Sequence, residues 1–334
     1  MRRRLINSSM EFPSWLAPYQ PRLPLRSLVE EINRIYHYFD AAKYDAEHVE
    51  IRLLWPGLWA EMMRQLPERD VWRVLDFGCG TGFATEQVVQ NLSSRLNGVV
   101  AFDPSRQMLQ RGKDRLQNPK IIFTDDMNAV EERGPYNLLV TNSVLHHLPD
   151  VEETLSKLQT FLSGDVYWLS GNEPSALFYK NPHCVHLFKE YEAYQERKKW
   201  LQPSAYVAKL KHTFGVDSFS KTSRVALERG LFALRPSASV ISRLVDFHVH
   251  HVADDAGAGR GFDLTMMQSA FKVHWRLRWT RTYSYLGPFN ELRAPRKWRE
   301  QARLLQARFP QDGANFCSVW SRVGSHSSEA TVPA

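Results

Sequence analysis

Short β-rich segments alternate with helical segments between residues 71 and 171, and this alternation constrains the fold more than any other feature. Helices are expected at about 83–92, 104–117 and 150–163. The third helix begins with a capping box, in which Asp150 accepts from the amide of Glu153 and Glu153 reaches back. Apolar strands that alternate with amphipathic helices form a parallel sheet covered on both faces. We therefore expect a doubly wound α/β domain with strands at 71–77, 98–103, 120–124, 136–142 and 165–170.

The remaining sequence divides into four parts around this core. Residues 1–70 read as an irregular arm followed by a helical cap, and residues 172–262 as an insertion that selects the substrate, with a possible strand at 243–252. Residues 263–323 supply strands at 272–287 and 315–323 and a helix at 293–308, and residues 324–334 read as a disordered tail. The chain is thus expected to form a Rossmann-like seven-stranded sheet with a helical N-terminal cap and a helical lid insertion.

Composition limits where the protein works. The longest apolar runs of the 334 residues are far shorter than the ~20 that a membrane span needs. The basic opening MRRRL is followed by no continuous apolar stretch, which argues against a secretory signal. Three cysteines at scattered spacings, Cys79, Cys184 and Cys317, favour a reduced compartment without a disulfide framework. We therefore expect a cytoplasmic protein.

The net charge of +7 is concentrated near the C-terminus. Residues 272–308 contain ten Lys and Arg against two Glu, together with Trp275, Trp279 and Trp298. One interpretation is a solvated helix face beside a sheet edge. The other is a surface that attracts a phosphate-bearing partner.

The segment VLDFGCGTGF carries the strongest chemical signal, because a strand runs directly into a glycine-rich turn and a helix. Gly78, Gly80 and Gly82 allow a tight turn and a close approach of the backbone to a ligand. A dinucleotide fingerprint needs a small residue where this sequence has Phe83, and the lysine of a phosphate-binding loop is absent. The spacing therefore disfavours a nicotinamide or flavin dinucleotide.

With Asp76 ahead of the glycines, the turn resembles motif I of the class I S-adenosylmethionine-dependent methyltransferases. The resemblance continues in order through AFDPS, IIFTDDM and YNLLVTNSVLHHLPD. The last of these is similar to the strand-four motif of small-molecule methyltransferases, including the quinone-biosynthesis group. The resemblance covers residues 71–171 well and the terminal strands less closely.

This resemblance implies that the cofactor is S-adenosylmethionine. It places Asp76 at the cofactor's amino group, Asp103 at both ribose hydroxyls, and Asp126 with the amide of Met127 at the adenine. The aromatic residues of the cap suit a sulfonium through cation–π attraction, although the same spacing also suits packing. The other cofactor-binding residues that we predict are Gly78, Cys79, Gly80, Gly82, Pro104, Met108, Asn142, Ser143, Tyr36 and Tyr44.

Histidines are the candidates for proton transfer. His146 and His147 follow the fourth strand, where the methyl group should emerge, and either could take a proton from the acceptor or merely hold the loop. His250, in FHVHHVADD, is a further candidate that faces the substrate. The same segment could bind a divalent ion, but no second cluster stands at ligand spacing, so we expect no metal.

Three functions are compatible with these motifs. The first is methylation of O, N or C of a small-molecule acceptor, which the aromatic insertion suggests is apolar or aromatic. The second is methylation of RNA or another nucleic acid through the basic stretch. Against it, Asn142 is followed by Ser143-Val144-Leu145 and not by the Pro-Pro-aromatic motif of base-amine enzymes. The third is a non-catalytic cofactor-binding module. The basic stretch could equally guide an anionic acceptor or a carrier protein, and a homo-oligomer is also compatible with the sequence.

Overall fold

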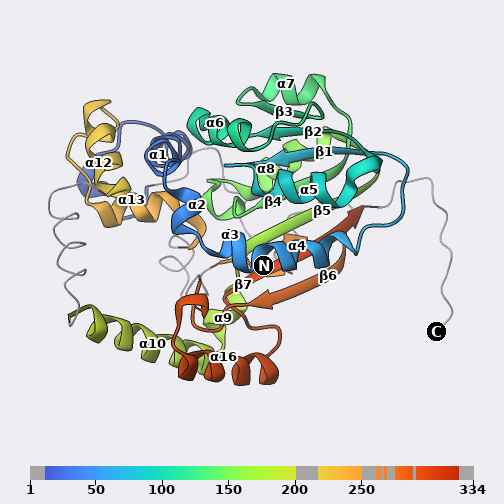
Figure 1. Cartoon of the computed structure of the whole chain (residues 1–334). Helices are drawn as coiled ribbons and strands as arrows, with labels where there is room; N and C mark the ends of the chain where they lie inside the picture. The colour runs from blue at the N-terminus through green and yellow to red at the C-terminus, as the bar shows by residue number, and fades with distance from the viewer. Residues whose placement is uncertain are drawn as a thin grey trace, which may run out of the picture.

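The structure is a computed structural model that describes residues 12–200, 217–249, 261–264, 267–268, 275–288 and 291–322, except for the side chains of residues 199 and 200. Within these residues a single seven-stranded sheet forms the centre of the molecule (Figure 1). Its strands are β1 (Trp72–Phe77), β2 (Leu96–Phe102), β3 (Ile121–Thr124), β4 (Tyr136–Asn142), β5 (Leu162–Pro174), β6 (Trp275–Tyr283) and β7 (Asn315–Arg322).

The strand order is β3-β2-β1-β4-β5-β7-β6. The first five strands run parallel, whereas β7 pairs antiparallel with both β5 and β6. The direction in which successive strands are added reverses between β1 and β4, which makes this the topological switch point of the sheet. Open α/β sheets bind their ligands at the switch point, beyond the carboxyl ends of the strands. The predicted seven-stranded Rossmann-like fold is therefore confirmed.

Helices cover both faces of this sheet because each presents one apolar side to it. One face packs against α4 (Trp55–Met63) and α5 (Phe83–Leu92), and α6 (Arg106–Arg115) adds Leu109. The other face packs against α7 (Met127–Glu132) and α8 (Val151–Thr160). The short helix α7 lies where the sequence predicted no helix.

The first turn of α8 confirms half of the predicted capping box. Asp150 Oδ1 accepts the amide of Glu153 at 2.8 Å, as expected. The side chain of Glu153 turns to Arg26 of α1 instead, at 2.6 Å, so the reciprocal bond that we predicted is wrong. An ion pair thus joins α8 to the N-terminal helices.

The N-terminal cap is built around α1 (Leu25–Asp40), which is followed by α2 (Tyr44–Glu47) and α3 (Glu50–Leu53). The apolar face of α1 packs against α12 (Ser218–Glu228) and α13 (Ala238–Val245). These three helices lie together at one side of the sheet (Figure 1). Part of the predicted insertion therefore packs with the cap.

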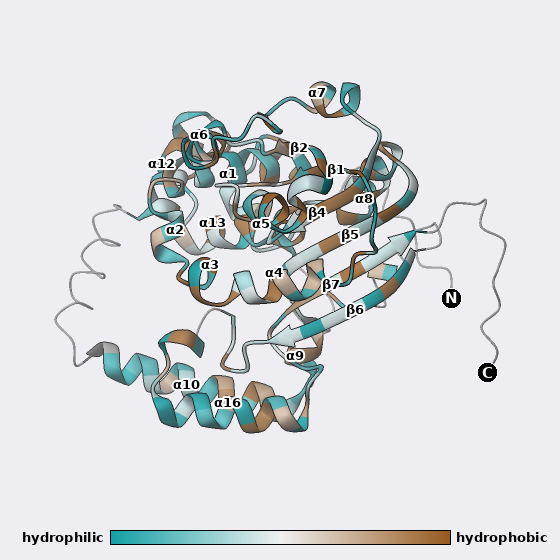
Figure 2. Ribbon diagram, turned by 45° about the vertical axis from the view of Figure 1, so that its right-hand side comes forward, coloured by the Kyte–Doolittle hydropathy of each residue, from teal (hydrophilic) through white to brown (hydrophobic). Residues whose placement is uncertain are grey.

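The other described helices of the insertion pack elsewhere. α9 (Ala176–Lys180) and α10 (Pro182–Trp200) lie beside α16 (Arg296–Arg308), and the three share an apolar cluster (Figures 1 and 2). The residues predicted as one insertion therefore divide between two ends of the molecule.

The strand predicted at 243–252 is wrong for its described part. Residues 238–245 form α13, and residues 247–249 are also helical. Val240, Ile241, Leu244 and Val245 are buried at helical spacing against α1, and Ser237 caps the helix by accepting the amide of Val240. A short apolar run is compatible with both the helical and the strand period, and here its packing against α1 selects the helix. His250 lies outside the described residues.

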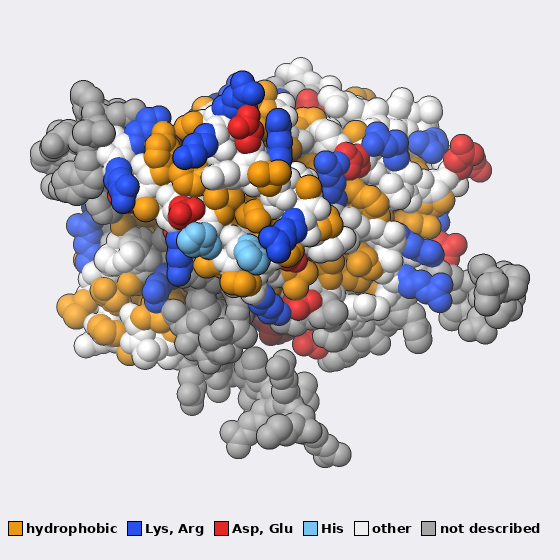
Figure 3. Space-filling model, turned by 90° about the horizontal axis from the view of Figure 1, so that it is seen from below, with side chains coloured by type: hydrophobic (Ala, Val, Ile, Leu, Met, Phe, Trp, Pro, Cys, Tyr) orange, Lys and Arg blue, Asp and Glu red, His pale blue; other side chains and the backbone are white. Residues whose placement is uncertain are grey.

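Two basic residues of the C-terminal part form ion pairs with acidic side chains. Arg281 of the edge strand β6 pairs with Glu61, and Arg296 of α16 pairs with Glu300 at 2.7 Å. Trp275, the first residue of β6, is buried in the core. Figure 3 views the side where α10 and α16 lie, and Lys and Arg are interspersed there with hydrophobic and acidic side chains. Among the described helices, none is long and apolar enough to cross a membrane.

Candidate active site

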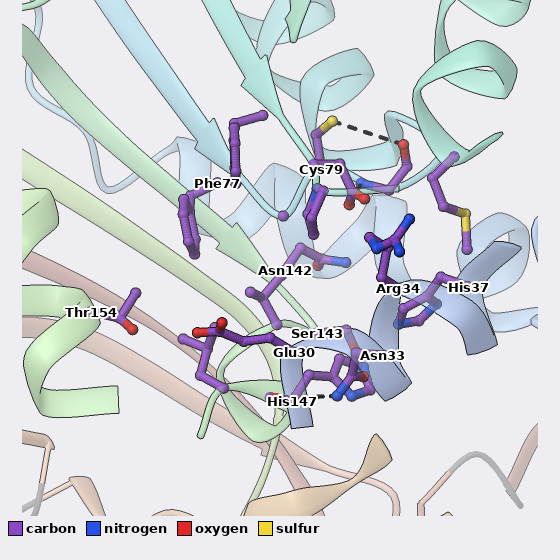
Figure 4. A pocket seen from close by; sticks show the side chains of 18 of the residues that line it. Glu30, Asn33, Arg34, His37, Phe77, Cys79, Asn142, Ser143, His147 and Thr154 are labelled. Carbon is purple, nitrogen blue, oxygen red and sulfur yellow. Dashed lines mark hydrogen bonds between the residues drawn. The ribbon is translucent and has the colours of Figure 1, made fainter. Parts of the chain in front are cut away.

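A cavity of about 570 Å³ opens at the carboxyl ends of β1, β2 and β4. The glycine-rich turn, the residues after β2 and the residues after β4 form its floor. Side chains of α1 form its roof, and residues 148–158, which include the start of α8, close one side. Figure 4 shows Asn142 near the middle of this cavity, with His37 and His147 together at one end.

The glycine-rich turn depends on its glycines for two reasons. Gly78, Gly80 and Gly82 have φ angles of 74°, 53° and 83°, in the left-handed region that other residues rarely adopt. A Cβ on Gly78 would also lie 2.4 Å from Cγ2 of Val144. The turn therefore packs directly against the loop that follows β4.

Asp103 lies at the end of β2 with both carboxylate oxygens engaged. Oδ2 accepts the amide of Gly80 at 2.9 Å, and Oδ1 accepts the amide of Ser105 at 2.8 Å. Burial raises the pKa of Asp103 to about 6, against the lowering effect of these two bonds. Each oxygen of the ionised group can accept a second bond, and Asp103 lines the cavity, so it can bind two adjacent hydroxyl groups.

Asp76 lies beneath the glycine-rich turn and is fully buried. Its Oδ2 accepts the hydroxyl of Thr85 at 2.5 Å, whereas Oδ1 has no hydrogen-bond partner among the described residues. Burial raises the pKa of Asp76 to about 7. Asp76 is absent from the described cavity wall, so its contact with the cofactor's amino group stays a prediction.

Most of the predicted cofactor residues line the cavity. These are Tyr44, Gly78, Cys79, Gly80, Asp103, Pro104, Met108, Met127, Asn142 and Ser143. Besides Asp76, three predicted residues lie away from the described wall. Gly82 caps α5, Asp126 caps α7 through the amide of Asn128, and Tyr36 stacks on Phe219 of α12.

Sequence reasoning missed the polar residues of the roof. Asn33 and His37 of α1 line the cavity and stand one helical turn apart. Burial lowers the pKa of His37 well below its ordinary value, so it is neutral at pH 7. The spacing of four residues in the predicted cap was the available signal, since it places both on one helix face.

Asn142, at the end of β4, has a fixed orientation. Its Oδ1 accepts the indole N–H of Trp59 at 3.0 Å and the side-chain NH2 of Asn172 at 2.6 Å. Because an indole nitrogen can only donate, the oxygen of Asn142 must face Trp59. The NH2 group of Asn142 is therefore directed away from Trp59 and is a donor for a ligand in the cavity.

The two adjacent histidines have different environments. His147 lines the cavity, and its Nδ1 lies 2.8 Å from the carbonyl oxygen of Val245. Since a carbonyl only accepts, Nδ1 carries the proton, and Nε2 of the neutral ring is an acceptor. Burial, followed by the charge of His146, lowers the pKa of His147 to about 4. His147 is thus a neutral imidazole at pH 7 that can accept a proton from a ligand.

His146 lies outside the described cavity wall, with Nδ1 2.9 Å from Oε2 of Glu173. Burial alone would lower the pKa of His146, but the hydrogen bond and charge of Glu173 outweigh it and raise the pKa. Burial likewise opposes ionisation of Glu173, yet His146 and two backbone amides hold its pKa below the ordinary value. Each group of the pair therefore favours the charged form of the other.

His146, His147 and Asp246 form a group whose ligand atoms lie within 4.8 Å of one another. The atom of His147 closest to Asp246 is Nδ1, at 3.7 Å, and this nitrogen donates its proton to Val245. A metal ion bound there would have to displace that proton and break the bond to Val245. Metal binding through this nitrogen would therefore compete with the hydrogen bond between His147 and Val245.

The glycine-rich turn at the switch point and the paired acceptor atoms of Asp103 define a nucleoside-cofactor-binding α/β domain. Residues 75–165 match the family model described as a methyltransferase domain. A trans-aconitate 2-methyltransferase of Rhizobium leguminosarum bv. trifolii is 30% identical over 45% of this chain and 60% of its own length. A malonyl-[acyl-carrier protein] O-methyltransferase of Bacillus anthracis is 30% identical over 28% and 34%.

An S-adenosylmethionine-dependent methyltransferase structure from Mesorhizobium loti is 12% identical, with a TM-score of 0.40, over 79% of this chain and 96% of that one. The chain spans about a third to three fifths of the length of the first curated relatives it matches. Residues 75–165 thus match a methyltransferase domain, in agreement with the motifs of the sequence, and those motifs imply S-adenosylmethionine as the cofactor.

Proposed function

We propose that this protein transfers the methyl group of S-adenosylmethionine to an O, N or C atom of a small-molecule acceptor. The observation that carries the proposal is the cavity itself. Its glycine-rich turn and Asp103 suit the cofactor, and the neutral His37 and His147 lie at its other end. The cavity is within the size range of small-molecule sites.

The residues of the cofactor region fit the group chemically. Asp103 has one free acceptor position on each oxygen for the ribose hydroxyls, and Tyr44 lines the cavity and would offer an aromatic face to the sulfonium. The unpaired Oδ1 of Asp76 is a buried acceptor close to the turn. When bound, the cofactor supplies a methyl group on a sulfonium that is already activated as a leaving group.

The chain's own contribution is mainly to hold the two reactants in line. Orientation of this kind can account for much of the rate acceleration of a displacement. The NH2 group of Asn142 is a donor for an oxygen of the bound molecules, and Nε2 of His147 accepts the proton that an attacking hydroxyl or amine releases. Burial and the neighbouring His146 lower the pKa of His147, so its ring is unprotonated before the reaction and is a weak base.

The walls favour an acceptor with an apolar or aromatic body. Apolar side chains such as Phe77, Leu148 and Leu158 line the cavity, while the charged residues Arg26 and Arg34 of its wall are paired with glutamates. The relatives named above act on trans-aconitate and on a malonyl carrier protein, so a carboxylate or a carrier-bound acceptor is the alternative. We propose that α12 and α13 influence acceptor choice, because they support α1, the roof of the cavity.

Methylation of nucleic acid has less support. Two arginines of the basic stretch, Arg281 and Arg296, are engaged in ion pairs, and Trp275 is buried in the core and unavailable for base stacking. A cytoplasmic location belongs to the proposal as well, since Cys79, Cys184 and Cys317 are free thiols. Homo-oligomerisation stays open to measurement by sedimentation.

The test supplies S-adenosylmethionine with a deuterated methyl group to the purified protein plus a cell extract. Mass spectrometry then follows the label into small-molecule, RNA and protein fractions. We expect label in a discrete metabolite, and none with the Asp103→Ala variant. Label in RNA or in a carrier protein would replace the acceptor class proposed here. Cofactor binding without any label would indicate a non-catalytic module.

A further inference from the structure

Three consecutive residues at the end of β5 hold the loop that follows β4. The carbonyl oxygen of Gly171 accepts the amide of Ser143 at 2.8 Å, and that of Asn172 accepts its hydroxyl at 3.3 Å. Glu173 then binds the next three residues of the loop. The pairing of β5 with β7 shifts register between Ser170 and Glu173, so a bulge turns these residues toward the loop.

Glu173 makes the largest contribution to this contact. Its Oε1 accepts the amides of Val144 and Leu145 at 2.9 and 3.0 Å, and its Oε2 binds Nδ1 of His146 at 2.9 Å. The side chain is fully buried. A buried carboxylate is very unfavourable unless hydrogen bonds and an opposite charge satisfy it, and here the loop supplies all three bonds.

The loop has a shape that it would not keep on its own. Ser143 has a φ of 58°, a left-handed conformation that is rare for residues with a side chain. Ser143 and Val144 line the cavity, Val144 packs against Gly78 of the cofactor turn, and His147 follows two residues after Leu145. The position of this loop therefore determines both the cofactor turn and the cavity-facing histidine.

We propose that Glu173 is the positioning residue of the site, and that it acts by holding residues 143–147 against the glycine-rich turn. Glu173 touches neither reactant. It fixes the loop through its three bonds, so that Val144 supports Gly78 and His147 faces the cavity. The inference rests on the proposed function, since it assigns Glu173 a role in that same site.

Several titratable groups surround this pair. His146 is faced by Glu173 of β5, by His147 of its own loop, by His37 of α1 and by Asp246 after α13. Tyr283 of β6 and Cys317 of β7 lie close enough to Glu173 for its charge to raise the pKa of each. A proton titration of His146 therefore reports most directly on Glu173, its closest charged partner.

The experiment measures the affinity of S-adenosylhomocysteine by calorimetry at pH 8 for the wild type and for Glu173→Ala, Glu173→Gln and Glu173→Asp. Glu291→Ala is the matched control, because Glu291 also accepts a backbone amide, that of Tyr285 at 2.9 Å, outside the described cavity wall. We expect Glu173→Ala and Glu173→Asp to bind at least about tenfold more weakly, because the loop amides lose their acceptor. Glu173→Gln should remain within about threefold of the wild type, because its amide oxygen can still accept both.

A second measurement separates positioning from general stability. The ring-proton resonances of His146 should titrate at a lower pH in Glu173→Gln than in the wild type, because the neighbouring charge is lost. The proposal would be overturned if His146 titrated at the same pH in Glu173→Gln as in the wild type. It would also be overturned if the Gln and Ala variants bound S-adenosylhomocysteine equally weakly. Wild-type affinity in Glu173→Ala would overturn it as well. If Glu173→Ala does not fold, Glu173→Asp takes its place in the comparison. Absence of binding by the wild type itself would refute the proposed function instead.

Discussion

Replacement of Asp103 by alanine is the sharpest test of the cofactor site. Both oxygens of the carboxylate already accept one backbone amide, from Gly80 and Ser105, and each keeps one acceptor position for a ribose hydroxyl. A hydrogen bond to a charged group contributes about 1.5–3 kcal/mol net. Loss of two such bonds should therefore weaken the binding of S-adenosylhomocysteine by about 10²- to 10⁴-fold, with tenfold as the lower limit.

Calorimetric titration at pH 8 measures this change directly. Asp125→Ala is the matched control, because Asp125 follows the neighbouring strand β3 but pairs with Arg106 outside the described wall of the cofactor cavity. Its affinity should equal that of the wild type. An affinity of Asp103→Ala within twofold of the wild type would show that Asp103 does not bind the ribose.

The pH dependence gives an independent check on the same residue. The hydroxyls of the ribose donate to the ionised carboxylate, and the pKa of Asp103 in the free protein is raised to about 6. Wild-type affinity should therefore be constant above about pH 7 and fall as the pH drops through 6. The residual affinity of Asp103→Ala should lack this dependence. Parallel profiles for the two proteins would contradict the reasoning.

Three further substitutions test the surrounding structure. Burial raises the pKa of Asp76 to about 7 from 3.8, so the folded protein keeps a proton that the unfolded chain releases. This stabilisation is complete below pH 4 and lost as the pH rises through 7. Relative to Asp76→Asn, the wild type should therefore lose up to about 4 kcal/mol of unfolding free energy over that range in urea titrations; parallel curves would refute this. Gly78→Ala brings a Cβ to 2.4 Å from Val144 and should abolish measurable S-adenosylhomocysteine binding; normal calorimetric affinity would argue against this packing. Gly171→Ala brings a Cβ to 2.6 Å from Oδ1 of Asn142 and should lower the free energy of unfolding in urea by about 1–3 kcal/mol. An unchanged free energy of unfolding would mean that the side chain of Asn142 moves aside without cost.

The sheet and the cofactor turn could be predicted because their signals are local. The central strands β1, β2 and β4 are rich in apolar residues, and the glycines of the turn stand at fixed spacing after β1. Residues at the carboxyl ends of parallel strands meet at one edge, which is why Asp103 and Asn142 could be assigned to one site. No knowledge of distant contacts was needed for these assignments.

The rest depends on contacts between distant segments. Which side of α1 turns to the cavity is decided by its packing on α12 and α13, so Asn33 and His37 could not be recognised from their own surroundings. Asp126 was assigned to the adenine, but its side chain caps α7, a helix that the sequence pattern did not reveal. The sequence around Glu173 has no feature that distinguishes it from other residues after a strand. Only the bulge of β5 brings its side chain to the loop of residues 143–147.

The roof of the cavity has a consequence for how the protein is synthesised. Asn33 of α1 bonds to the carbonyl oxygen of Leu244 at 3.4 Å, a separation of 211 residues along the chain. Domains begin to fold from the N-terminus during translation, whereas contacts of such long range form late. A nascent chain that has released β1 to β5 thus holds the complete glycine-rich turn, while Leu28 and Ile32 of α1 still lack their buried neighbours from α12 and α13. Until residues 218–245 leave the ribosome, the apolar face of α1 therefore remains accessible to chaperones and to aggregation.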